Sequence, residues 1–212
     1  MKRFKSLFAT AALMTFGIVT ASAAATITVP GTSNPFLAGA SVGNSVSNGD
    51  TDSFSADAPP AISVTPGQTF SVISVTGLVS NGPCCSLVGP NGGAGIGSSP
   101  FTANGFTALV SPYSNLPINS LIGVFYGPNQ SDPGVDTVFE IGAGPASFVV
   151  PTGATELFLA TVDGYQWNNN EGAFTVTYSL GGVPEPAAWI VLLTGFGMLG
   201  FGLRKFGAVA TA

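Results

Sequence analysis

The positive charges of this chain are confined to its two ends. The five basic residues are Lys2, Arg3, Lys5, Arg204 and Lys205, and there is no histidine. All ten carboxylates lie between them, from Asp50 to Glu185, with no basic side chain to pair with. Nucleic acids and other polyanions are excluded as partners, because binding them requires cations that neutralise phosphates. A hard divalent cation suits this acidic, oxygen-rich middle better.

The middle of the chain is predicted to be one all-β domain. It spans roughly 160 residues, enough to bury a hydrophobic core. The chain contains 29 glycines and 16 prolines, and together with frequent Thr, Ser and Val they favour strands joined by tight turns. No stretch from 24 to 180 shows a sustained helical period.

Several short runs read as individual strands. Residues 174–179 alternate apolar and hydroxyl side chains, the pattern of a half-buried strand. Residues 62–65 and 69–76 flank a Pro-Gly turn and predict a hairpin. Residues 147–150 and 156–162 flank a Pro-Thr-Gly turn. Together these runs predict an antiparallel β-sandwich over residues 61–180.

The N-terminus has the features of a secretory signal peptide over residues 1–23. A basic start precedes the apolar run Leu7–Val19, and small residues at 21–23 form a signal-peptidase site. We therefore expect export, with processing before Ala24. The following residues, 24–60, include a stretch rich in Ser, Asn, Gly and Asp and are predicted to be a loose N-terminal segment.

A second apolar run, Ala187–Leu203, is predicted to be a transmembrane helix. It contains no charge and ends at Arg204-Lys205, which marks the cytoplasmic side. At about 1.5 Å per residue it would span about 25 Å, enough for an inner membrane with little tilt. Residues 204–212 would form a short cytoplasmic tail.

The C-terminal signal as a whole resembles the PEP-CTERM sorting signal. Its features are the linker 181–186 with Pro184-Glu185-Pro186, the apolar run with Trp189, and the basic pair. The resemblance implies recognition by an exosortase-type enzyme. The precursor would be anchored in the inner membrane and then delivered to the cell surface or extracellular matrix. One departure is the tail 206–212, since such signals usually end soon after the basic cluster.

The segment 163–172 gathers oxygen donors between two predicted strands. It reads Asp-Gly-Tyr-Gln-Trp-Asn-Asn-Asn-Glu-Gly. An Asp-Gly start and an Asn run also suit the left-handed backbone positions of an ordinary hairpin loop.

Residues 60–180 resemble the galactophilic, calcium-dependent LecA-type bacterial lectins. The matching motifs are 77–83, 89–92, 121–123, the Pro151 turn and 157–176. The resemblance implies side-chain calcium ligands at Asp163, Asn169 and Asn170, with backbone carbonyls of Asn81 and Gln166. The spacing from Asp163 to Asn169 is one residue shorter than in the family. Ca²⁺ accepts such amide and main-chain oxygens beside carboxylates, and open positions could take sugar hydroxyls.

Sugar specificity does not carry over from that family. Its sugar-contacting loop contains a histidine, and this chain has none; the corresponding loop 93–100 is small and featureless. Tyr165 and Trp167 could stack on a sugar face, or Trp167 could belong to the core.

We expect no enzymatic activity. Without histidine, or lysine in the domain, only carboxylates could perform acid and base catalysis. Their spacing, at Glu140, Glu156, Asp163 and Glu171, supports no catalytic pair.

The adjacent Cys84 and Cys85 would close a negligible loop, so a disulfide between them adds little stability. Free thiols, a strained vicinal pair and contacts to another chain remain open.

The sequence therefore predicts an exported surface or matrix protein with a calcium-dependent carbohydrate-binding module. The alternative is a structural protein of the surface or biofilm matrix that has the same fold and binds no sugar. The expected partners are signal peptidase, an exosortase-type enzyme, the membrane, and an extracellular polysaccharide or glycan.

Overall fold

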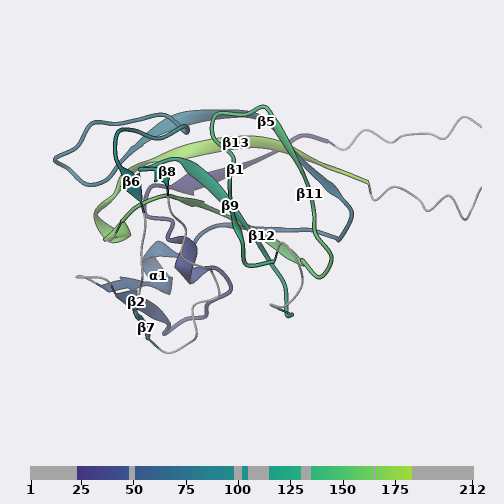
Figure 1. Ribbon diagram of the computed structural model, residues 1–212, viewed down its shortest axis with the longest axis horizontal. Helices are drawn as coiled ribbons and strands as arrows, with labels where there is room; N and C mark the ends of the chain where they lie inside the picture. The colour runs from purple at the N-terminus through teal and green to yellow at the C-terminus, as the bar shows by residue number, and fades with distance from the viewer. Residues whose placement is uncertain are drawn as a thin grey trace, which may run out of the picture.

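The computed structural model describes residues 23–47, 51–97, 102–104, 115–129, 135–164 and 166–182. These residues form an all-β protein, as predicted, with two four-stranded antiparallel sheets (Figure 1). The first sheet has the order β1 (Ala25–Pro30), β13 (Glu171–Gly181), β5 (Thr69–Ser80), β11 (Ala146–Val149). The second has the order β10 (Val138–Glu140), β9 (Leu121–Tyr126), β12 (Glu156–Thr161), β4 (Ala61–Ser63).

Shorter elements complete the described part of the chain. A small sheet has the order β3 (Thr51–Ser53), β2 (Ser45–Ser47), β7 (Thr102–Asn104), and a two-stranded one pairs β6 (Ile96–Gly97) with β8 (Leu116–Pro117). The helical pieces are η1 (Pro35–Leu37), α1 (Phe54–Asp57) and η2 (Trp167–Asn169).

The two large sheets share one hydrophobic core. Strand β13 contributes Phe174 and Val176, both fully buried, while Thr175 between them is exposed. From the second sheet, Leu157 and Leu159 of β12 point into the same core. The prediction of a half-buried strand over 174–179 is therefore confirmed. Its cause is the two-residue period of a strand, which places alternate side chains on one face.

The second sheet is also covered on its outer face. Strands β9 and β12 read as nearly continuous apolar runs, and most of their residues are buried on both faces. Ile122 and Phe158 face a second hydrophobic cluster that includes Phe36, Val46 and Trp167. The chain before β4 and the loop after β12 therefore form a cover over this sheet.

This cover differs from the loose segment expected over 24–60. Strand β1 pairs with β13 along its whole length, from Ala25 opposite Tyr178 to Pro30 opposite Ala173. Phe36 and Leu37 are buried in the second cluster. The polar composition predicted a loose segment, but a few apolar residues spaced by Ser, Asn and Gly are enough to attach it to the two sheets.

The hairpin expected from 62–65 and 69–76 was wrong. Strand β4 pairs with β12 in the second sheet, whereas β5 pairs with β13 and β11 in the first. The Pro-Gly turn thus carries the chain from one sheet to the other, and Gly67 N donates to Val150 O at 2.9 Å. The Pro151 turn likewise connects β11 and β12 of different sheets.

The sorting signal is not part of the described structure. Pro184, Glu185 and Pro186, the run 187–203, and Arg204 with Lys205 all lie outside the described residues. Among the described residues, none of the helices has the length and apolar character of a membrane span.

Candidate functional site

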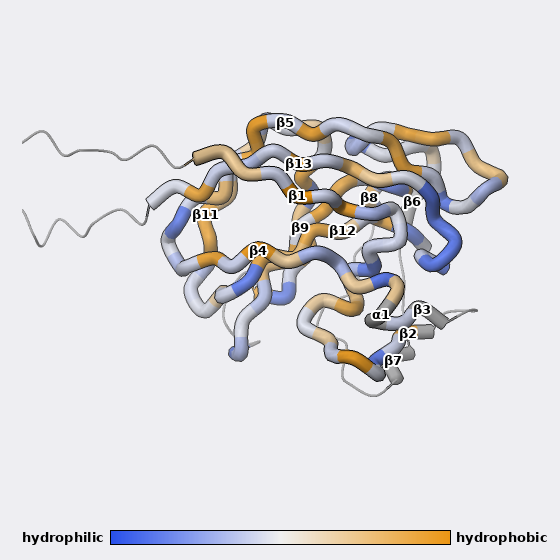
Figure 2. The backbone as a smooth tube through the Cα atoms, turned by 180° about the vertical axis from the view of Figure 1, so that it is seen from behind, coloured by the Kyte–Doolittle hydropathy of each residue, from blue (hydrophilic) through white to orange (hydrophobic). Residues whose placement is uncertain are grey.

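The candidate site lies where the loop between β12 and β13 passes from the second sheet to the first. Glu171, the first residue of β13, pairs with Ser80, the last residue of β5. Asn81 therefore follows β5 directly beside the end of that loop. The loop is a hydrophilic stretch at the end of the sheets away from the start of β1 and the end of β13 (Figure 2).

Trp167 anchors this loop from inside. Its side chain is fully buried, and its indole Nε1 donates to Thr161 O at 2.9 Å. The ring also meets Phe36 edge to face, with centroids 6.0 Å apart. Of the two roles that the sequence left open, the structure gives Trp167 the core role, so it cannot stack on a sugar. Tyr165 lies outside the described residues.

The short helix η2 turns the chain back toward the first sheet. Gln166 before it has a left-handed backbone with φ of 64°. Its carbonyl accepts a hydrogen bond from Asn169 N at 3.2 Å, and its side-chain Oε1 accepts one from Asn169 Nδ2 at 3.3 Å. The Gln166 carbonyl, expected as a metal ligand, thus already has one donor and keeps one lone pair.

Asn170 is held firmly at the base of the loop. It is 6% exposed, and its Nδ2 donates to Gly31 O at 3.1 Å, while Thr161 Oγ1 donates to the same carbonyl at 2.7 Å. The amide oxygen Oδ1 of Asn170 is buried and has no hydrogen-bond partner within the described residues. Leaving such an acceptor without any partner costs about 1 to 3 kcal/mol, so this oxygen is available to a bound water or ligand.

Asp163 brings a carboxylate to the same loop. Its side chain is 3% exposed, and its Oδ1 accepts a hydrogen bond from Gly164 N at 2.5 Å. No basic side chain occurs between Lys5 and Arg204. A buried carboxylate in such a chain needs hydrogen bonds, protonation or a bound metal ion to offset its charge.

The loop after β5 lies against the loop after β12. Gly82 has φ of 94°, and a Cβ placed on it would lie 3.1 Å from Asn169 Oδ1. Asn169 itself is exposed and Asn81 is half-buried. The pKa of the Cys85 thiol is raised, mainly by its hydrogen bond with Cys84 and in the smallest part by the negative charge of Asp163. The five expected calcium ligands thus belong to two loops that approach each other at Gly82 and Asn169.

The donor set suits calcium better than a transition metal. Among the described residues, no three His, Cys, Asp or Glu side chains gather around a common point that could hold a metal ion. A cation at this end would therefore depend on Asp163 together with amide and main-chain oxygens. That hard, mostly neutral set fits Ca²⁺, with modest affinity because it brings one carboxylate.

Other buried polar residues at this end were not expected from the sequence. Asn119 N donates to Val162 O at 2.7 Å, and Val162 N donates to Ser120 O at 3.0 Å. Asn119 Oδ1 and Ser120 Oγ are buried and have no hydrogen-bond partner in the described ranges. No sequence signal could have found them, because only the pairing of their loop with the end of β12 brings them near Asp163.

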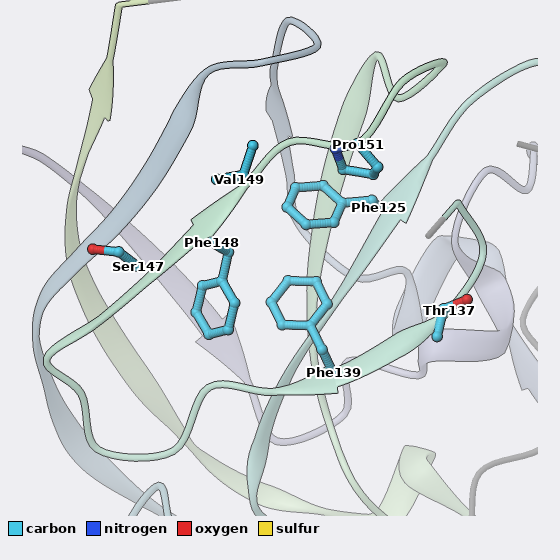
Figure 3. A pocket seen from close by; sticks show the side chains of 7 residues that line it. All are labelled: Phe125, Thr137, Phe139, Ser147, Phe148, Val149 and Pro151. Carbon is cyan, nitrogen blue, oxygen red and sulfur yellow. The ribbon is translucent and has the colours of Figure 1, made fainter. Parts of the chain in front are cut away.

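A groove lies between β10 and β11, which are edge strands of the two large sheets. This groove encloses about 410 Å³. Figure 3 shows the rings of Phe125, Phe139 and Phe148 gathered in it, with Phe139 4.9 Å from Phe125 and 4.5 Å from Phe148 between centroids. Its lining contains hydroxyl groups but no carboxylate or amide side chain, so it offers little to a cation.

Neither a protein-family model, nor a curated protein, nor a solved structure matches this chain.

Proposed function

We propose that this chain is an exosortase-sorted protein of the cell surface or matrix, whose lectin-like β-sandwich domain binds carbohydrate through calcium. It acts by binding and has no catalytic role. Export, sorting and anchoring are assigned to the two ends of the sequence, and calcium binding to the loops after β5 and β12.

The placement of the folded domain supports the sorting part. Strand β1 starts at Ala25, two residues after the small-residue site at 21–23, so signal-peptide removal leaves the first sheet intact. Strand β13 ends at Gly181, just before the Pro-Glu-Pro motif. Both end signals can thus be processed without cutting a strand.

The observation that carries the calcium part is the burial of two oxygen-bearing side chains on the loop after β12. Asp163 brings a 3% exposed carboxylate into a domain without any basic side chain, and Asn170 brings a buried amide oxygen without a partner among the described residues. Both groups belong to the loop after β12, and both are oxygen ligands of the kind that Ca²⁺ accepts. The loop after β5 adds the carbonyl of Asn81, as in the LecA-type pattern.

A structural surface protein with the same fold is the second candidate. Burial of Trp167 favours it, because this removes one of the two rings that could have stacked on a sugar. Calcium would then stabilise the domain without serving as a bridge to a glycan. Titrating calcium and then mixed glycans on the same protein separates the two candidates.

Replacing Asp163 with Asn tests calcium binding. The substitution keeps the side chain's size and turn preference while removing its charge. A ligand present at about 100 times its Kd stabilises the folded state by roughly 2.7 kcal/mol. For a domain of this size that raises Tm by about 5 to 10 °C. We expect wild type to show this rise in calcium and Asp163→Asn to lose most of it.

Asp136→Asn is the matched control. Asp136 is also a buried aspartate, 5% exposed. Its backbone N–H donates to Phe125 O, near the end of β9, whereas the candidate site lies near the start of β9, where Leu121 pairs with Thr161. This variant should keep the full calcium response. Equal responses of wild type and Asp163→Asn to calcium and to chelator would refute the calcium site.

A further inference from the structure

Two exposed thiols lie beside the candidate calcium site. Strand β5 ends at Ser80, and the following turn is closed by a hydrogen bond from Cys85 N to Gly82 O at 3.2 Å. It presents Cys84 and Cys85 to solvent, with their sulfur atoms 2.7 Å apart. Both thiols are therefore accessible to an oxidant and close enough to be joined by it.

We infer that Cys84 and Cys85 form a redox-sensitive dithiol that closes to a vicinal disulfide and thereby tunes the neighbouring cation site. The regulatory half of this inference rests on the proposed calcium binding, whereas ring closure does not. A disulfide of low molecular weight or of a partner protein is the oxidant. Such oxidants are at hand outside the cytoplasm, where this domain is proposed to act.

Ring closure proceeds by thiol–disulfide exchange. The Cys84 thiolate attacks one sulfur of the oxidant and forms a mixed disulfide, releasing the other half as a thiolate. The Cys85 thiol then loses its proton and attacks Cys84 Sγ, which releases the second half. In total the two thiols lose two protons and two electrons, and the oxidant becomes two thiols.

A disulfide between adjacent cysteines is suited to reversible redox switching and not to stabilising the fold. Consecutive Cα atoms are about 3.8 Å apart across a trans peptide, whereas disulfides usually join Cα atoms about 4.4 to 6.8 Å apart. A bond between neighbours is therefore strained and easily reduced, and it closes too small a loop to add stability.

Disulfide closure would affect the cation site, because the turn that contains the two cysteines also contains Asn81 and Gly82. Gly82 lies against Asn169, since a methyl group at Gly82 would be 3.1 Å from Asn169 Oδ1. Ser80 Oγ also donates to Gly82 O at 3.2 Å and joins the turn to the end of β5. A change in the backbone of 84–85 thus shifts the segment that holds the Asn81 carbonyl.

The test uses the full chain in detergent, reduced with dithiothreitol and then treated with oxidised glutathione. A peptide containing both cysteines should become lighter by two hydrogen atoms, and dithiothreitol should reverse the change. Disulfide-linked dimers, glutathione retained on the cysteines, or unchanged thiols would each overturn the inference.

The regulatory half is measured by calcium titration of both redox states, followed by the shift in Tm. We expect the calcium midpoint to differ at least about threefold between oxidised and reduced wild type, and not at all in Cys85→Ser or Cys84→Ser. Equal midpoints in the two wild-type states would overturn the regulatory half. Ring closure without any calcium response in either state would instead refute the proposed calcium function and leave the dithiol assignment standing.

Discussion

Replacing Trp167 with Phe isolates the contribution of one buried side chain that holds the candidate site in place. The substitution keeps an aromatic ring but removes the indole N–H that donates to Thr161 O at 2.9 Å. It also shortens the ring that meets Phe36 at 6.0 Å. Both interactions attach the loop after β12 to the outer face of the second sheet.

The expected loss has two parts. Losing a donor to a buried carbonyl costs about 1 to 3 kcal/mol. A smaller ring leaves a few tens of Å³ empty, and at about 24 cal/mol per Å³ this adds roughly 1 kcal/mol. The free energy of unfolding should therefore fall by about 2 to 4 kcal/mol. For a domain of this size Tm falls by about 5 to 15 °C.

Far-ultraviolet circular dichroism during urea and thermal unfolding measures this loss, since it needs no tryptophan signal. Trp189→Phe is the matched control, because it changes the only other tryptophan, which lies in the proposed membrane segment. Its unfolding should match that of wild type. If Trp167→Phe is destabilised by less than about 0.5 kcal/mol, the loop is not anchored through Trp167.

Three further predictions concern other parts of the chain. Burial raises the pKa of Asp136 above its ordinary value of 3.8, and neither carboxylate oxygen has a hydrogen-bond partner among the described residues. The protonated Asp136 contributes stability that is present below pH 3.8 and is lost as pH rises through the raised pKa. Asp136→Asn should therefore be more stable than wild type at pH 7, by about 1 kcal/mol, and should lose that advantage near pH 3.8 and below. An advantage independent of pH would contradict this. Gly77→Ala should destabilise the first sheet by more than about 2 kcal/mol in urea unfolding, because Gly77 has φ of 101° and a Cβ there would clash with the carbonyl of Ala173; wild-type stability would count against it. Mass spectrometry of exported protein should find an N-terminus near Ala24, and deletion of 187–203 should release the protein to the medium; an uncleaved N-terminus or a membrane-bound deletion variant would contradict the proposed processing and anchoring.

The strands could be predicted where a local pattern decides burial. Residues 174–179 alternate because β13 is solvated on one face, and that period is visible in the sequence. Strands β9 and β12 are apolar almost throughout because both of their faces are covered. The sequence of these strands does not indicate which segment covers their outer face, since any apolar layer would bury it.

Connections between strands were harder to predict than the strands themselves. A Pro-Gly turn between β4 and β5 is compatible with a hairpin or with a crossing between sheets. The choice depends on the partners, β12 for β4 and β13 for β5, which are distant in sequence. The same holds for Asn119 and Ser120, which reach the candidate site only through their pairing with Val162.

The lack of basic residues connects these observations. Asp57, Asp136 and Asp163 are all buried, and none can form a salt bridge within the domain. Asp57 accepts a hydrogen bond from Ser53 N at 2.9 Å, and burial raises its pKa. Without a basic neighbour, its negative charge can only be offset by backbone donors or removed by protonation. Asp163 differs because its loop is approached by the loop after β5, where Gly82 lies against Asn169. Under the proposed function, Ca²⁺ bound between these loops would supply the positive charge that no basic side chain of the domain can bring to Asp163.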